Sequence, residues 1–112
     1  MTGRFVRACR VSDVPLGEGR TALVDGVRVA IFHTAAGWYA TDATCPHRGG
    51  PLADGLVADD SVTCPLHQRR FDLDSGDALG HDCPAVTVHR IELRGDELYV
   101  CVGARVAVGL AA

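Results

Sequence analysis

Apolar positions along this 112-residue chain recur mainly with the two-residue alternation of β-strands. Strand candidates are RFVRACRV (4–11), RTALVDGVRVAIFH (20–33), GWYATD (37–42) and AVTVHRIELRGDELYVCV (85–102). Asp25-Gly26 and Gly95-Asp96 interrupt two of these runs with tight-turn residues, which predicts two β-hairpins. No window of about a dozen residues shows helical periodicity. We therefore expect an all-β fold.

The last apolar run departs from strict alternation. Val86 and Val88 share one parity, whereas Ile91 and Leu93 have the other. A bulge, or burial of the strand on both of its faces, would explain the change.

The middle of the chain, residues 43–84, has a different composition. It contains four of the five prolines and many glycines, which is typical of loops. Because long irregular loops in a compact domain tend to be functional, we expect the site to lie here.

Length and charge narrow the class of protein. The chain is long enough for a single domain over residues 1–112, and its net charge of −3 argues against a dedicated nucleic-acid binder. No segment has the length and apolar character of a signal peptide or a membrane span. We therefore expect a soluble cytoplasmic protein, in which the five cysteines are thiols or metal ligands and not disulfides.

Two short segments pair a cysteine with a histidine. The first is Cys45-Pro46-His47 and the second is CPLH, which begins at Cys64 and ends at His67. Such ligands could hold zinc, but zinc fingers usually pair cysteine with cysteine and histidine with histidine. A binuclear iron–sulfur cluster fits the mixed order better, because two thiolates can bind one iron and two imidazoles the other.

At these residues the sequence closely resembles the Rieske [2Fe–2S] family, whose motif is C-x-H followed by C-x-x-H. The resemblance implies that Cys45 and Cys64 bind one iron of the cluster, and His47 and His67 the other. It also implies a Rieske-type fold of small antiparallel sheets, with the two cluster-binding loops (about residues 43–84) at one tip.

Within that family, the run CPHRGGPLADGLVADDSVTCPLHQRRFDLDSGDAL (45–79) is most similar to the small subunit of assimilatory NAD(P)H-dependent nitrite reductase. This resemblance implies an oxidoreductase subunit without catalytic residues of its own. The catalytic centre, with FAD, a [4Fe–4S] cluster and sirohaem, would lie on a large partner subunit that reduces nitrite to ammonium in nitrate assimilation.

Two alternatives stay open. One is a free Rieske ferredoxin that serves an aromatic-ring dioxygenase through a flavin reductase, although those ferredoxins usually have glycine at the position of Gln68. The other is a metal-binding domain that only stabilises a complex.

The resemblance also bears on the reduction potential. High-potential Rieske proteins have a disulfide where this chain has Gly50 and Leu66, and serine and tyrosine hydroxyls where it has Arg69 and Phe71. Hydrogen bonds from those hydroxyls to the cluster sulfurs raise the potential. Their absence predicts a low-potential cluster.

Three arginines beside the ligands, Arg48, Arg69 and Arg70, could form a positive rim where a partner docks. The alternative is that they are ordinary solvated arginines.

The remaining candidates have structural explanations. Cys9, Cys83 and Cys101 are expected to be buried or partly buried thiols, and a second metal site at His81 and Cys83 lacks further ligands. The other residues of this kind are His33 and His89 in strands, Trp38 and Tyr39 in packing, and Asp72, Asp74 and Asp77 in a turn.

Overall fold

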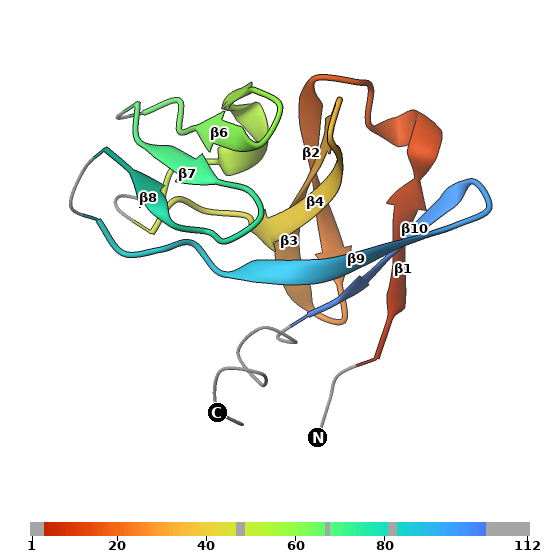
Figure 1. The fold of residues 1–112 in the computed structure, drawn as a ribbon. Coiled ribbons are helices and arrows are strands. Elements are labelled where there is room, and N and C mark those ends of the chain that lie inside the picture. Colours follow the sequence, from red (N-terminus) through yellow and green to blue (C-terminus); the bar gives the residue numbers. More distant parts are fainter. Residues whose placement is uncertain (1–3, 47–48, 67, 81–82, 103–112) are drawn as a thin grey trace.

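The structure is a computed structural model that describes residues 4–46, 49–66, 68–80 and 83–102. Within these ranges the chain forms two antiparallel β-sheets (Figure 1). In spatial order, the six-stranded sheet consists of β1 (Val6–Arg10), β10 (Glu97–Cys101), β9 (Val88–Arg94), β4 (Gly37–Asp42), β3 (Val27–Thr34) and β2 (Glu18–Val24). The four-stranded sheet consists of β5 (Leu56–Val57), β6 (Ser61–Thr63), β7 (Arg70–Asp72) and β8 (Ala78–Leu79).

The helical structure in the described ranges is two 3-10 turns, η1 (Val11–Asp13) and η2 (Leu52–Asp54). No helix among those residues is long and apolar enough to cross a membrane. The all-β prediction is confirmed.

Both predicted hairpins form. Asp25 and Gly26 connect β2 to β3 with φ angles of 52° and 79°. A two-residue type I′ hairpin turn requires such positive φ angles at both of its central residues. Gly95 has φ 65° and begins the two-residue connection between β9 and β10. Their sequence signals are therefore explained by backbone geometry.

Strand β3 separates two apolar cores, because both of its faces are buried. Ala30 and Phe32 face the loop core, whereas Val29 and Ile31 face the sheet core. The loop core comprises Ala30, Phe32, Cys45, Leu52, Ala53, Val62, Cys64, Phe71, Leu73 and Val86. The sheet core comprises Val14, Val24, Val29, Ile31, Ala40, Leu98 and Val100.

The two cores also explain the irregular alternation of the last apolar run. Val86 precedes β9 and is buried in the loop core, whereas Ile91 lies within β9 and packs against the sheet core. Pairing between β9 and β10 continues without a shift from Arg90 to Arg94. Neither explanation therefore holds for β9 itself, because Val86 lies outside the strand and Arg90, Glu92 and Arg94, on the face opposite Ile91, are exposed. The register shift of the large sheet lies in β1, between Arg7 and Cys9.

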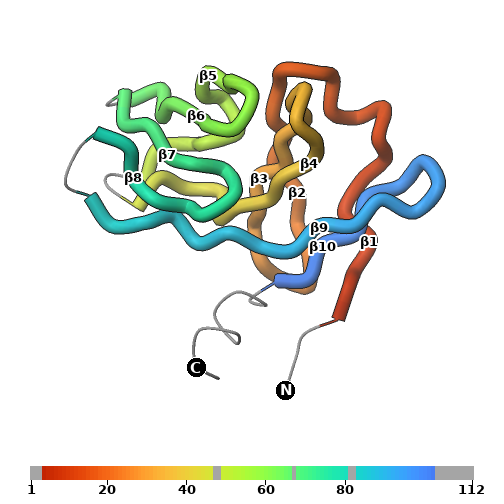
Figure 2. The backbone as a smooth tube through the Cα atoms, in the orientation of Figure 1, coloured from red at the N-terminus to blue at the C-terminus, as the bar shows by residue number. Residues whose placement is uncertain are grey.

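The middle segment is more regular than the sequence indicated, because it contains the whole small sheet. Its strands are only two or three residues long, too short for an alternation pattern to be recognised. The chain that leaves β4 runs beside this small sheet (Figures 1 and 2), and Cys45 joins Val62 and Phe71 in the loop core. This arrangement brings the two predicted ligand segments together.

Candidate metal centre

The first predicted ligand loop, residues 45–50, is closed by two backbone hydrogen bonds. The N–H of Cys45 donates to the carbonyl of Gly50 over 2.8 Å, and the N–H of Gly49 donates to the carbonyl of Cys45 over 2.7 Å. Gly49 has φ 75°, in the left-handed region that favours glycine.

The second loop, residues 64–69, repeats this pattern residue for residue. The N–H of Cys64 donates to the carbonyl of Arg69 over 2.7 Å, and the N–H of Gln68 donates to the carbonyl of Cys64 over 3.0 Å. Gln68 has φ 55° and so takes the left-handed position that Gly49 has in the first loop. Two loops of the same backbone design therefore each present a cysteine at their first position.

The two cysteines lie in the same apolar environment. Cys45 is 2% exposed and Cys64 is fully buried, and both belong to the loop core. Gly50 of the first loop meets the second loop closely, because a Cβ atom at this position would lie 2.9 Å from Cys64 Sγ. The loops are thus in contact at a sulfur atom, with no room for a side chain between them.

Residues that flank the cysteines are exposed. Pro46 follows Cys45, Pro65 and Leu66 follow Cys64, and all three side chains face solvent. His47 and His67, the predicted imidazole ligands, lie outside the described residues. The described parts of both loops therefore run from a buried thiol to an exposed surface.

The residues present fit a [2Fe–2S] cluster. Cys45 and Cys64 are free of disulfides, so both can act as thiolate ligands. Gly50 keeps the space beside Cys64 Sγ clear, and Arg69 has a buried Nε atom without a hydrogen-bond partner among the described residues. When bound, such a cluster supplies reversible one-electron transfer.

Gly50, Leu66 and Phe71 stand at positions that, by resemblance, tune the reduction potential in high-potential Rieske proteins. Gly50 and Leu66 are neighbours, since a Cβ atom on Gly50 would lie 3.1 Å from Leu66 Cγ. Neither side chain contains sulfur, so the disulfide of those relatives is absent here. Phe71 on β7 is fully buried in the loop core and has no hydroxyl to donate.

The three arginines of the predicted rim have different environments. Arg70 is exposed, and its Nη2 lies 3.4 Å from Ser61 Oγ. Arg69 is partly buried, and Arg48 lies outside the described residues. A docking role stays a prediction for all three, and among the described pair Arg70 is the better exposed.

The other cysteines are structural thiols. Cys101 is buried in β10, and Cys83 packs against the loop core. Burial raises the pKa of the Cys9 thiol, and the nearby Asp13 carboxylate raises it further, so this group stays protonated. His81, which was paired with Cys83 as a possible second site, lies outside the described residues.

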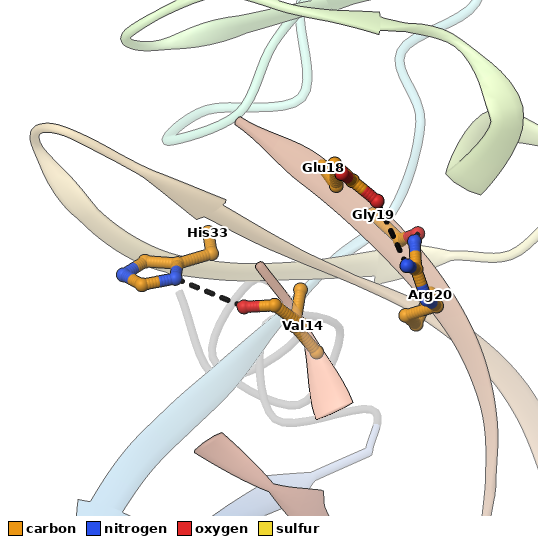
Figure 3. A network of polar contacts seen from close by, with 5 residues as sticks. All are labelled: Val14, Glu18, Gly19, Arg20 and His33. Atoms are coloured by element: carbon orange, nitrogen blue, oxygen red, sulfur yellow. Dashed lines mark hydrogen bonds and ion pairs between the residues drawn. The ribbon is translucent and has the colours of Figure 1, made fainter. Parts of the chain in front are cut away.

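The side chain of His33 has a structural role. Its ring stacks on Trp38 with centroids 3.8 Å apart. Its Nδ1 donates to the carbonyl of Val14 over 3.0 Å (Figure 3). The contact with Val14 ties the segment after η1 to β3. On β2, Arg20 is held within its own strand by Glu18 and by the carbonyl of Gly19 (Figure 3).

His89 and Asp42 join β9 to β4. The Nε2 atom of His89 lies 2.8 Å from Asp42 Oδ1, and the imidazole is 3% exposed. This contact explains a buried histidine without a metal.

The aspartates after the second loop form a turn. One carboxylate oxygen of Asp72 accepts the N–H groups of Asp74 and Ser75 over 2.8 and 2.9 Å, and the N–H of Asp77 donates to Ser75 Oγ. Tyr39 packs against the loop core, and burial raises its pKa, with Asp74, Asp60 and Asp72 adding to the effect. The structural explanations of these residues are confirmed.

Sequence reasoning missed the roles of Gly50 and Gln68 in the loop backbone. Aligning the two loops on their cysteines would have placed Gln68 opposite Gly49. The double glycine at 49–50 was a visible signal, but it does not reveal that one glycine makes a turn and the other makes room for a sulfur atom.

We predict that Gly50→Ala weakens cluster retention. The added methyl would press on Cys64 Sγ, and overpacking of this kind costs about 1–3 kcal/mol, or roughly 5-fold to 150-fold in cluster retention. Visible absorbance and iron content per chain measure the effect. Thr44→Ala, at an exposed neighbouring site, is the control and should leave both unchanged. Full cluster content in Gly50→Ala would contradict the close contact.

We predict that Gln68→Gly is more stable than Gln68→Ala. A left-handed backbone costs a residue with a Cβ atom about 1–2 kcal/mol, which outweighs the usual advantage of alanine of about 0.4–1 kcal/mol. The melting temperature of the cluster-loaded protein should differ by a few degrees, since 1 kcal/mol is worth about 4–8 °C.

Ala58→Gly, at an exposed loop position without positive φ, is the matched comparison and should lower the melting temperature. If alanine were the more stable residue at position 68 as well, the left-handed assignment would be wrong.

The chain resembles several proteins of known class. It is 36% identical over 87 residues to the ferredoxin component of the naphthalene 1,2-dioxygenase system of Pseudomonas putida, covering 78% of this chain and 81% of the relative. The ferredoxin of carbazole 1,9a-dioxygenase from Nocardioides aromaticivorans superposes with a TM-score of 0.79 at 27% identity, over 87% of this chain and 96% of that one.

A Mycobacterium tuberculosis protein assigned as the small subunit of NADH-dependent nitrite reductase also superposes with a TM-score of 0.79. Its identity is 25%, over 88% of this chain and 94% of that one. Residues 4–101 match the family of Rieske-like [2Fe-2S] domains. With two matching loops, two buried cysteines and this family match, the chain belongs to the Rieske-like [2Fe-2S] domain family and is an electron-transfer protein.

Proposed function

We propose that this chain is the Rieske-type small subunit of an NAD(P)H-dependent nitrite reductase. It would exchange one electron at a time with a large subunit that holds FAD, a [4Fe–4S] cluster and sirohaem. The large subunit would reduce nitrite to ammonium, and this chain would contribute no catalytic residue. Structural neighbours assigned as nitrite reductase small subunits support this proposal.

Gln68 is the observation that carries the proposal. It directly follows His67, it is exposed, and its φ of 55° makes glycine the least strained residue at this position. Ferredoxins of ring-hydroxylating dioxygenases usually have that glycine, as the resemblance of the sequence implies. This chain instead keeps a polar side chain on the surface beside the cluster, which suits a different partner.

The arrangement of the loops suits an electron carrier. The two thiols are buried in the loop core, while the residues between and beside the ligands are exposed. We expect His47 and His67 to bring the second iron to the exposed side, where a partner can approach. Arg70 would add positive charge to that surface and speed docking of an acidic partner in a salt-dependent way.

The second candidate function is a ferredoxin that feeds an aromatic-ring dioxygenase. The 36% identity to a naphthalene dioxygenase ferredoxin over most of both chains favours it. The geometry at the cysteines serves either function, because both need an accessible low-potential cluster. What distinguishes them is the identity of the partner.

Affinity capture of the tagged chain from its own host, grown on nitrate as the nitrogen source, tests the choice. We expect a co-purifying large protein with the absorption of sirohaem and flavin, and NAD(P)H-dependent nitrite reduction by the complex. Arg70→Glu should weaken this capture, whereas Arg10→Glu, an exposed charge on β1, should leave it unchanged. Capture of an oxygenase or its flavin reductase without sirohaem would overturn the proposal in favour of the ferredoxin.

A further inference from the structure

Arg69 contains a buried nitrogen without a partner. Its Nε atom is inaccessible to solvent and has no hydrogen-bond acceptor in the part of the chain that the structure describes. A buried donor left unsatisfied costs about 1–3 kcal/mol, and more when it belongs to a charged group. Such an atom calls for a physical explanation.

The backbone fixes Arg69 at the cluster loop. Its carbonyl accepts the N–H of Cys64 over 2.7 Å, which closes the second ligand loop, and its neighbour Arg70 begins β7. The side chain therefore starts from a point that is tied directly to a predicted iron ligand.

Among the described residues, few atoms near the ligand loops could accept a hydrogen bond from Arg69 Nε–H. Cys45 Sγ and Cys64 Sγ could also accept a hydrogen bond, yet neither is a partner of Arg69 Nε. The family match supplies one further set of acceptors at this place, the two inorganic sulfides of the cluster. Sulfide is anionic, so a donor from a guanidinium group suits it.

We propose that Arg69 Nε–H donates a hydrogen bond to an inorganic sulfide of the bound cluster and thereby raises its reduction potential. On reduction one ferric iron accepts one electron and becomes ferrous, so the cluster gains one negative charge. The guanidinium keeps its proton throughout and stabilises the added charge. Arg69 would thus act on the reduction potential of the cluster.

With this hydrogen bond, position 69 offers the cluster a donor, contrary to the expectation from the sequence. Phe71 still offers none, so the cluster has one side-chain donor where high-potential relatives have two. Its potential would then lie above that of a Rieske cluster without either donor. The proposal needs only the cluster, so it holds for a nitrite reductase subunit and for a ferredoxin alike.

Two substitutions separate the hydrogen bond from the charge. In Arg69→Gln the amide nitrogen takes the place of Nε, one bond beyond Cδ, and the charge is lost. In Arg69→Met a methyl group takes that place, and both the charge and the N–H are lost. Arg70→Gln removes the neighbouring charge and is the control.

The midpoint potential of each purified variant is measured by titration of the visible spectrum, with iron and sulfide content as the check on loading. We expect Arg69→Met to shift the equilibrium about tenfold toward the oxidised form, or about 59 mV lower for one electron. Arg69→Gln should keep most of the wild-type potential, and Arg70→Gln should change it little. Equal shifts in the methionine and glutamine variants, or none in the methionine variant, would overturn the proposal.

A measurement on the wild-type chain covers the case in which Arg69→Met does not hold a cluster. With ¹⁵N-labelled arginine, electron–nuclear double resonance of the reduced cluster should detect a nitrogen coupling that persists in Arg70→Gln. Absence of this coupling in a fully loaded wild-type protein would also overturn the proposal. Both experiments use the isolated chain, so their outcome is independent of which partner is found.

Discussion

Burial of the two predicted cysteine ligands, Cys45 and Cys64, constrains this end of the molecule, because both lie in an apolar core and would have to be thiolates to bind iron. Burying an anion without compensation is strongly unfavourable. If Cys45 and Cys64 bind iron as proposed, the metal would compensate their charge within the loop core. Cluster binding would then stabilise the folded form of this end of the molecule.

The six-stranded sheet supports the end of the molecule that carries the two cysteines. Strand β3 has the sheet core on one face and the loop core on the other, so the larger sheet supplies one wall of the loop core. The segment after β4 and the small sheet close over the other face of β3, and each delivers one cysteine. The two loops then reach the core with the same pair of backbone hydrogen bonds.

Much of this could be predicted from particular residues. Asp25-Gly26 specified its hairpin because that turn needs positive φ, and the order of Cys45, His47, Cys64 and His67 specified the type of metal centre. The strands of the small sheet could not be predicted, because their pairing is set by contacts between segments and not by local alternation. The conformation of Gln68 and the burial of Arg69 Nε could not be predicted either, because both depend on how the loop closes against the core.

We expect this chain to hold a binuclear iron–sulfur cluster with thiolates on one iron and imidazoles on the other. The most direct test is pulsed electron paramagnetic resonance of the reduced, purified protein, together with its metal and sulfide content. We expect about two iron atoms and two sulfides per chain, with nitrogen couplings from two imidazoles. A colourless protein that holds zinc, or a cluster without imidazole nitrogen couplings, would contradict it.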